Sequence, residues 1–183
     1  AAPKAGETVL VIGAGPIGLM CQQALQAMRG VSTMVCDLSA GRLEVARKLG
    51  ATRIVSSKDE DVAATALAWT DGEGVDLVVD AAGSAATKRL SLAALRPGGA
   101  AVWIGLHGNA VELESYGVTL PEKQIFGTYA AKIEELAEAL ELMRSGRVDV
   151  TSWTETVPLA QAVSAFHRMA NPGDCDLKAV FVP

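Results

Sequence analysis

The 183-residue sequence is 50% hydrophobic, carries a formal net charge of −5 and contains three cysteines. A chain of this length can bury one substantial core, so we expect a single domain or slightly more. The acidic balance argues against a nucleic-acid partner, and no apolar run approaches the ~20 residues that a membrane-spanning helix needs.

Short apolar runs recur along the first two thirds of the chain with few polar interruptions. Such runs are typical of strands that are buried on both faces of a parallel sheet. They predict six strands, over residues 8–12, 33–37, 53–55, 76–80, 101–105 and 124–129.

Ala-rich segments between these strands predict four helices. The first ends at Gly30, and the others are expected over residues 39–50, 59–70 and 84–95, the last stopped by "RPGG". Strand–helix alternation of this kind predicts an α/β protein with a doubly wound, six-stranded parallel sheet, the Rossmann fold. The first helix carries an apolar stripe on one face, formed by Ile17, Met20, Cys21, Ala24 and Met28.

The pattern changes after the sixth strand. An acidic helix over residues 131–145 is followed by "TSWTETVPL", another helix and a last strand, "LKAVFV". We therefore divide the chain into a Rossmann domain, 1–145, and a C-terminal tail of helix and strand, 146–183, that docks either on the sheet or on a missing partner domain. The alternation of Val111, Leu113 and Tyr116 in "GNAVELESYGVTL" predicts an exposed edge strand, which favours pairing between subunits.

The stretch "TVLVIGAGPIGLM" places glycines at 13, 15 and 18 between the first strand and the first helix. In this context Gly13 permits a tight turn, Gly15 lets the backbone approach a pyrophosphate, and Gly18 allows close packing of helix on strand. Pro16 fits the first helical turn, where its missing N–H costs nothing. The free amide groups near Ile17 then face the anion, with the helix dipole behind them.

Asp37 lies nineteen residues beyond Gly18, at the end of the second strand. A carboxylate there can accept both hydrogen bonds of an adenosine ribose diol and would repel a 2′-phosphate. The sequence therefore favours NAD(H) over NADP(H), and capping of the next helix is the alternative role for Asp37.

The motifs "GETVLVIGAGPIGLM", "CDLSAGRLEVARKLGAT", "GVDLVVDAAGS", "LRPGGAAVWIGL", "FGTYA" and "LKAVFV" occur in order over nearly the whole chain. Together they resemble the cofactor-binding half of the medium-chain dehydrogenase/reductase family, which includes zinc-dependent alcohol, polyol and threonine dehydrogenases. The resemblance implies a set of cofactor contacts. These are Pro16 and Ile17 at the pyrophosphate, Asp37, Leu38 and Arg42 at the adenosine, Ala82 and Gly83 near the middle, Ile104, Gly105, Leu106, Thr128 and Tyr129 at the nicotinamide, and Lys178 against the pyrophosphate.

The same resemblance implies hydride transfer between a secondary alcohol and nicotinamide, with an alcohol or ketone as the small-molecule substrate. It places the catalytic zinc in a separate lobe, so this chain alone is expected to bind cofactor without turnover. It also implies a homodimer or homotetramer. The alternatives are a zinc-independent quinone or enoyl reductase of the same family and a non-catalytic module that senses a dinucleotide.

The cysteines Cys21, Cys36 and Cys175 show no C-x-x-C pairing, which favours buried thiols in a reducing, cytoplasmic compartment. A metal site formed by Asp174, Cys175, Asp176 and His167 is the weaker interpretation, because structural zinc needs four well-spaced Cys or His ligands. His107, in an "HGN" turn, is expected at the surface.

Overall fold

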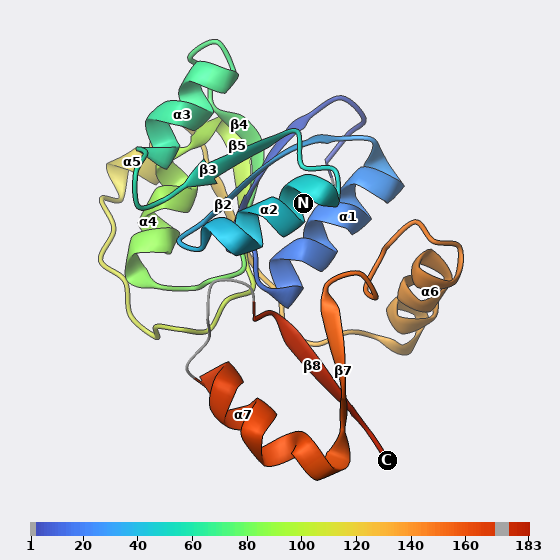
Figure 1. Cartoon of the computed structure of the whole chain (residues 1–183). Helices are drawn as coiled ribbons and strands as arrows, with labels where there is room; N and C mark the ends of the chain where they lie inside the picture. Colours follow the sequence, from blue (N-terminus) through green and yellow to red (C-terminus); the bar gives the residue numbers. More distant parts are fainter. Residues whose placement is uncertain (1–2, 171–175) are drawn as a thin grey trace.

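A computed structural model of the chain describes residues 3–170 and 176–183. Its centre is a six-stranded sheet in the order β3-β2-β1-β4-β5-β6 (Figure 1). All neighbouring strands are parallel, and this order is that of a doubly wound dinucleotide-binding fold. The strands are β1 (Thr8–Ile12), β2 (Ser32–Asp37), β3 (Arg53–Ser56), β4 (Val75–Asp80), β5 (Leu95–Trp103) and β6 (Gln124–Gly127).

Helices cover both faces of the sheet. One apolar cluster joins the strands to Leu19 and Leu43, from the first two helices, and the other joins them to Ala66 and Leu92, from the next two. The predicted fold class is therefore confirmed. The helices are α1 (Pro16–Arg29), α2 (Ala40–Lys48), α3 (Val62–Trp69), α4 (Ala85–Ala93), α5 (Tyr116–Thr119) and α6 (Ile133–Arg144).

The C-terminal residues form a small unit beside the main sheet (Figure 1). Its strands β7 (Thr154–Pro158) and β8 (Lys178–Val182) pair in parallel, and α7 (Ala162–Ala170) precedes β8. The connection to the main domain runs along α1, where Gln23 exchanges two hydrogen bonds of 2.9 and 2.7 Å with the backbone of Asp149. The sequence did not predict β7.

Two glutamines lie on the buried face of α1. Gln22 and Gln23 are 0% and 6% exposed, whereas Ile17 and Met28, of the apolar stripe, are 47% and 40% exposed. Gln22 Nε2 donates to the Ala46 carbonyl at 3.0 Å, although its Oε1 has no partner among the described residues, and Gln23 bonds the backbone of residue 149. The apolar stripe instead lines an open groove of about 300 Å³, to which Cys21, Ala24, Leu25, Met28, Leu77, Val79, Val102 and Ile104 contribute.

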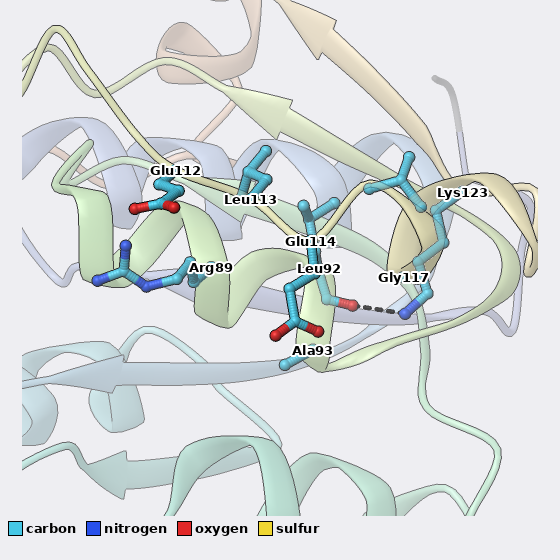
Figure 2. Close-up of a pocket in the computed structure, with 9 residues that line it drawn as sticks. Arg89, Leu92, Ala93, Glu112, Leu113, Glu114, Gly117 and Lys123 are labelled. Carbon is cyan, nitrogen blue, oxygen red and sulfur yellow. Dashed lines mark hydrogen bonds between the residues drawn. The ribbon is translucent and has the colours of Figure 1, made fainter.

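The predicted edge strand around Val111, Leu113 and Tyr116 is wrong. The chain there is irregular until it enters α5, and β6 forms that edge of the sheet. Leu113 packs against the core cluster that contains Leu92, which explains its apolar character without a strand. It lines a cavity of about 500 Å³ beside α4, where Lys123 Nζ donates to the Leu92 carbonyl at 2.7 Å (Figure 2).

Strand β5 begins before "RPGG" rather than after it. Leu95 pairs with Val75, but Ala100 pairs with Leu77, so the ladder is irregular across the Pro-Gly-Gly stretch. Helix α4 correspondingly ends at Ala93, ahead of the predicted stop, and β6 ends at Gly127, ahead of residue 129. The two glycines thus serve a bulge inside a strand.

Candidate functional site

The glycine loop joins β1 to α1 at the carboxyl edge of the sheet. Gly13 has φ +97°, a backbone conformation that side chains disfavour. A Cβ on Gly18 would lie 1.8 Å from the Gly13 carbonyl oxygen, so only glycine allows the helix to start this close to the loop. The roles predicted for these two glycines, in turn geometry and in close packing, agree with this geometry.

The N-terminus of α1 lacks a side-chain cap. Its N-cap is Gly15, no side chain of residues 3–170 and 176–183 accepts a hydrogen bond there, and the first turn has no acidic residue. In α2, α3 and α4, by contrast, Ser39, Asp61 and Ser84 each accept a backbone amide. A Cβ on Gly15 would meet nothing within 4 Å, so the space before the helix is open. Uncapped amides and an open approach suit an anion.

Asp37 lies at the end of β2, beside this loop. Its Oδ2 accepts the Ala14 amide at 2.7 Å and its Oδ1 accepts the Ser39 amide at 2.8 Å. The carboxylate is therefore held in place by one backbone bond on each oxygen. The cap of α2 is Ser39, which accepts the Arg42 amide, so Asp37 is not the residue that caps this helix.

A cavity of about 590 Å³ opens next to this carboxylate. Among its lining residues are five predicted contacts: Gly13, Asp37, Leu38, Arg42 and Ala82. This volume lies within the range of small-molecule sites. Sequence reasoning missed the rest of the lining, because only the order of the strands brings the end of β3 and the start of α4 to this place. The missed residues include Ser57, Glu60, Ser84, Ala86, Thr87 and Leu90.

The loops after β4 and β5 touch each other at the same edge. A Cβ on Gly83, which has φ +82°, would lie 2.1 Å from the carbonyl group of Gly105. The amides of Ile104 and Gly105 both donate to the Asp80 carbonyl, at 3.0 and 2.9 Å. These two amides are therefore already used within the protein and are not free to bind a ligand.

Four predicted contacts expose large apolar side chains along this edge. Ile17, Leu38, Leu106 and Tyr129 are 47%, 60%, 81% and 86% exposed, and they come from four different segments. The Thr128 amide donates to the Trp103 carbonyl at 3.2 Å, which fixes the start of the Thr128–Tyr129 segment.

Lys178 does not line the cavity. It is exposed at the start of β8. The nearby Asp176 does contact a residue of the cavity lining, since its carbonyl accepts a 3.0 Å hydrogen bond from Arg42. His107 is exposed just beyond Leu106. Of the weaker metal site, Asp174 and Cys175 lie outside the described residues.

Within residues 3–170 and 176–183, no three His, Cys, Asp or Glu side chains lie together in a way that could hold a metal ion. The described side chains therefore do not fit a zinc site. Within the same residues, no helix is long and apolar enough to cross a membrane.

Comparison with known proteins agrees with this fold. Residues 16–145 match the model of a family described as zinc-binding dehydrogenase. The chain belongs to the zinc-binding dehydrogenase family. It is 32% identical over 185 residues to an alcohol dehydrogenase of Cupriavidus necator, with 98% of the chain and 50% of that protein covered. The chain thus spans about half the length of the curated relatives it matches.

Solved structures show the same fold with two different cofactors. A short chain alcohol dehydrogenase from Escherichia coli CFT073, complexed with NADH, superposes with a TM-score of 0.89 at 23% identity, over 99% of this chain and 53% of that one. A protein from Sinorhizobium meliloti 1021, described as a zinc-binding dehydrogenase and bound to NADP, gives a TM-score of 0.87 at 27% identity, over 98% and 53%. Similarity to these structures therefore does not distinguish NADH from NADP, and the preference for one of them depends on the residues of this site.

Proposed function

We propose that this chain is the NAD(H)-binding domain of an alcohol-type dehydrogenase. The observation that carries the proposal is the Asp37 carboxylate, held by two backbone amides beside the uncapped start of α1 and the 590 Å³ cavity. A carboxylate at this position accepts hydrogen bonds from a ribose diol and repels a 2′-phosphate. The uncapped helix start is suited to the pyrophosphate.

The residues of the chain orient the cofactor rather than react with it. When bound, the nicotinamide accepts or donates the hydride, and the protein supplies its position and electrostatic surroundings. Asp37 and Leu38 hold the adenosine end, and Gly13, Gly15 and the first turn of α1 hold the pyrophosphate. The strand order then directs the second half of the cofactor over the loops after β4 and β5.

Calorimetric titration with NADH and with NADPH tests this assignment. We expect NADH to bind at least about tenfold more tightly, since one charge-assisted hydrogen bond contributes about 1.5–3 kcal/mol. Asp37→Ala should weaken NADH binding and narrow the difference between the two cofactors. Asp61→Ala is the matched control, because Asp61 also accepts a backbone amide, at 3.0 Å, but caps α3 outside the cavity. Equal affinities in the unaltered chain would refute the role of Asp37.

In the whole enzyme, we propose, the hydride passes between a secondary alcohol or polyol and nicotinamide. The related protein from Cupriavidus necator is an alcohol dehydrogenase, which supports an alcohol as the substrate. The chain alone is expected to bind cofactor without oxidising alcohol, since the family resemblance places the substrate-polarising zinc in another lobe. Formation of NADH from NAD and 2-butanol by the purified chain would contradict this.

The segment 146–183 is proposed to pack on that other lobe. Apolar side chains of the terminal unit are unusually open: Leu159, Val163 and Phe166 are 61%, 73% and 69% exposed, and Phe181 is 41% exposed. Exposed apolar surface of this kind marks an interaction site. Hydrogen–deuterium exchange should show protection of α7 and β8 rising in a longer protein that contains both lobes.

We also propose that the protein forms a homodimer or homotetramer and is located in the cytoplasm. Strand β6 is the edge of the sheet, and its Ile125 and Phe126 are each 38% exposed, so its unpaired side is suited to strand pairing. Cys21 and Cys36 are free thiols, in keeping with a reducing compartment. Light scattering that shows only a monomer would count against the assembly.

A further inference from the structure

Lysine 88 is nearly buried beneath the two loops at the nicotinamide end of the proposed site. Its side chain is 11% exposed, and its Nζ lies 3.9 Å from Oδ2 of the fully buried Asp80. The ammonium group also lies 5.2 Å from the centroid of the Trp103 ring. Burying a charge costs several kcal/mol unless partners compensate for it, so the partners of Lys88 require explanation.

Those partners belong to two different loops. Lys88 Nζ donates to the Gly83 carbonyl at 3.0 Å and to the Gly105 carbonyl at 3.5 Å. Gly83 follows β4 and Gly105 follows β5, and these adjacent strands end at the edge where the cofactor cleft lies. An ammonium group has three donors. The two carbonyls each accept one of them, and Asp80 Oδ2, at 3.9 Å, pairs with the charge of the ammonium group rather than by a hydrogen bond.

The rest of the surroundings holds this tether in place. Asp80 Oδ1 accepts the amides of Ala82 and Gly83 at 3.1 and 2.8 Å, so it fixes the same turn from below. The Gly108 amide also donates to the Gly83 carbonyl, at 3.0 Å, which joins the second loop to the first. Both loops are therefore fixed to one buried ion pair, whereas Asp37 is held by the amides of Ala14 and Ser39.

From this arrangement we infer that Lys88 is a positioning residue, which joins the loops after β4 and β5 and preforms the nicotinamide half of the cleft. The inference rests on the proposed function and deepens it, because it assigns the two halves of the cofactor to separately organised parts of the site. Lys88 would act through Gly83 and Gly105, not by contact with the reacting atoms.

The test compares NADH with AMP, which has only the adenosine half. For Lys88→Met we expect NADH binding to weaken about tenfold, because binding must then order the loops that Lys88 no longer holds. AMP binding should stay within about twofold, since the Asp37 carboxylate is held by the amides of Ala14 and Ser39. The fluorescence of bound NADH should shift toward that of free NADH, because the nicotinamide is less well held.

Lys123→Met is the matched control. Lys123 is also partly buried and donates to a carbonyl of α4, that of Leu92 (Figure 2). It directly precedes β6, however, and so lies at the amino ends of the parallel strands, whereas the cleft lies at their carboxyl ends. It should leave both affinities within about twofold of the unaltered chain. A second variant, Lys88→Met with Asp80→Asn, removes both charges and thus any unpaired buried carboxylate. It should recover thermal stability but keep the weak NADH binding.

Several results would overturn the inference. Equal losses for NADH and AMP in Lys88→Met would make Lys88 a residue of general stability, and recovery of NADH binding in the double variant would assign the effect to the unpaired Asp80. An unaltered chain that binds AMP but not NADH would show that the tether does not preform the nicotinamide half. An unaltered chain that binds neither ligand would instead refute the proposed function, and the role of Lys88 with it.

Discussion

Gly15→Ala separates the proposed binding role of the glycine loop from its structural role. Gly15 has φ −76° and ψ 179°, which alanine adopts without strain, and its Cβ would meet nothing within 4 Å. Alanine is a slightly poorer N-cap than glycine, by about 0.5 kcal/mol, but it restricts the unfolded chain by about 0.4–1 kcal/mol. The two effects offset each other, so the melting temperature should stay within about 2 °C.

Binding should respond quite differently, because the added methyl group occupies the space in front of the first-turn amides of α1. A pyrophosphate moved away from those amides loses at least one charge-assisted hydrogen bond, about 1.5–3 kcal/mol. The dissociation constant for NADH should therefore rise by about 10- to 150-fold. Calorimetry and a thermal melt on the same preparation measure both quantities.

Gly18→Ala is the comparison, since its Cβ would lie 1.8 Å from the Gly13 carbonyl oxygen. Overpacking against backbone costs about 1–3 kcal/mol, so this variant should melt about 2–12 °C lower. If Gly15→Ala binds NADH as the unaltered chain does, the space before α1 is not where the cofactor lies. If Gly15→Ala melts as low as Gly18→Ala, the argument from open space is wrong.

Three further changes test the structure at other points. Gly83→Ala places a Cβ 2.1 Å from the carbonyl of Gly105 at a φ of +82°; urea denaturation should show a loss of about 3 kcal/mol, from overpacking and positive-φ strain together. Burial raises the pKa of the Cys36 thiol from 9.0 to about 11. The stabilisation that the buried, neutral thiol gives the folded state is present below pH 9.0 and is lost as the pH rises to about 11. The free energy of unfolding should therefore fall over that range, and it should fall less in Cys36→Ala. Hydrogen bonds from Ser152 lower the pKa of Asp149 from 3.8 to about 2. This stabilisation is present above pH 3.8 and is lost as the pH falls to about 2; Asp149→Asn should therefore flatten the acid limb of a stability–pH curve.

The sequence predicted the central sheet well because its strands are buried on both sides. Val9, Leu10 and Val11 are all 0% exposed, so selection for burial leaves a continuous apolar run that is visible without a structure. Strand β7 leaves no such run. Among its residues "TETVP" only Val157 is buried, and the strand that it pairs with in the described part of the chain, β8, begins twenty residues beyond Pro158. A strand defined by one distant partner has no local pattern to reveal it.

The burial of α1 could not be inferred from its apolar periodicity, for a related reason. Periodicity identifies the apolar side of a helix, but burial also depends on whether polar side chains find partners. Gln22 and Gln23 are buried because carbonyls on α2 and at residue 149 accept their side-chain amides. These partners lie 24 and 126 positions away along the chain, so the hydrogen bonds that allow this burial could not be inferred from the helix itself.

Two aspartates show what the sequence could and could not tell about the site. Asp37 ends β2 and Asp80 ends β4, and each accepts two backbone amides. A carboxylate has about four acceptor positions. Asp80 accepts a third hydrogen bond, from Thr87 Oγ1 at 3.2 Å, and the Lys88 ammonium lies 3.9 Å from the same oxygen as an ion pair. Asp37 accepts one amide on each oxygen from the described residues and lines the cavity, which leaves two acceptor positions for the two hydroxyl groups of a ribose diol. The number of acceptor positions already occupied, which the motif does not encode, therefore makes one aspartate structural and the other suited to binding.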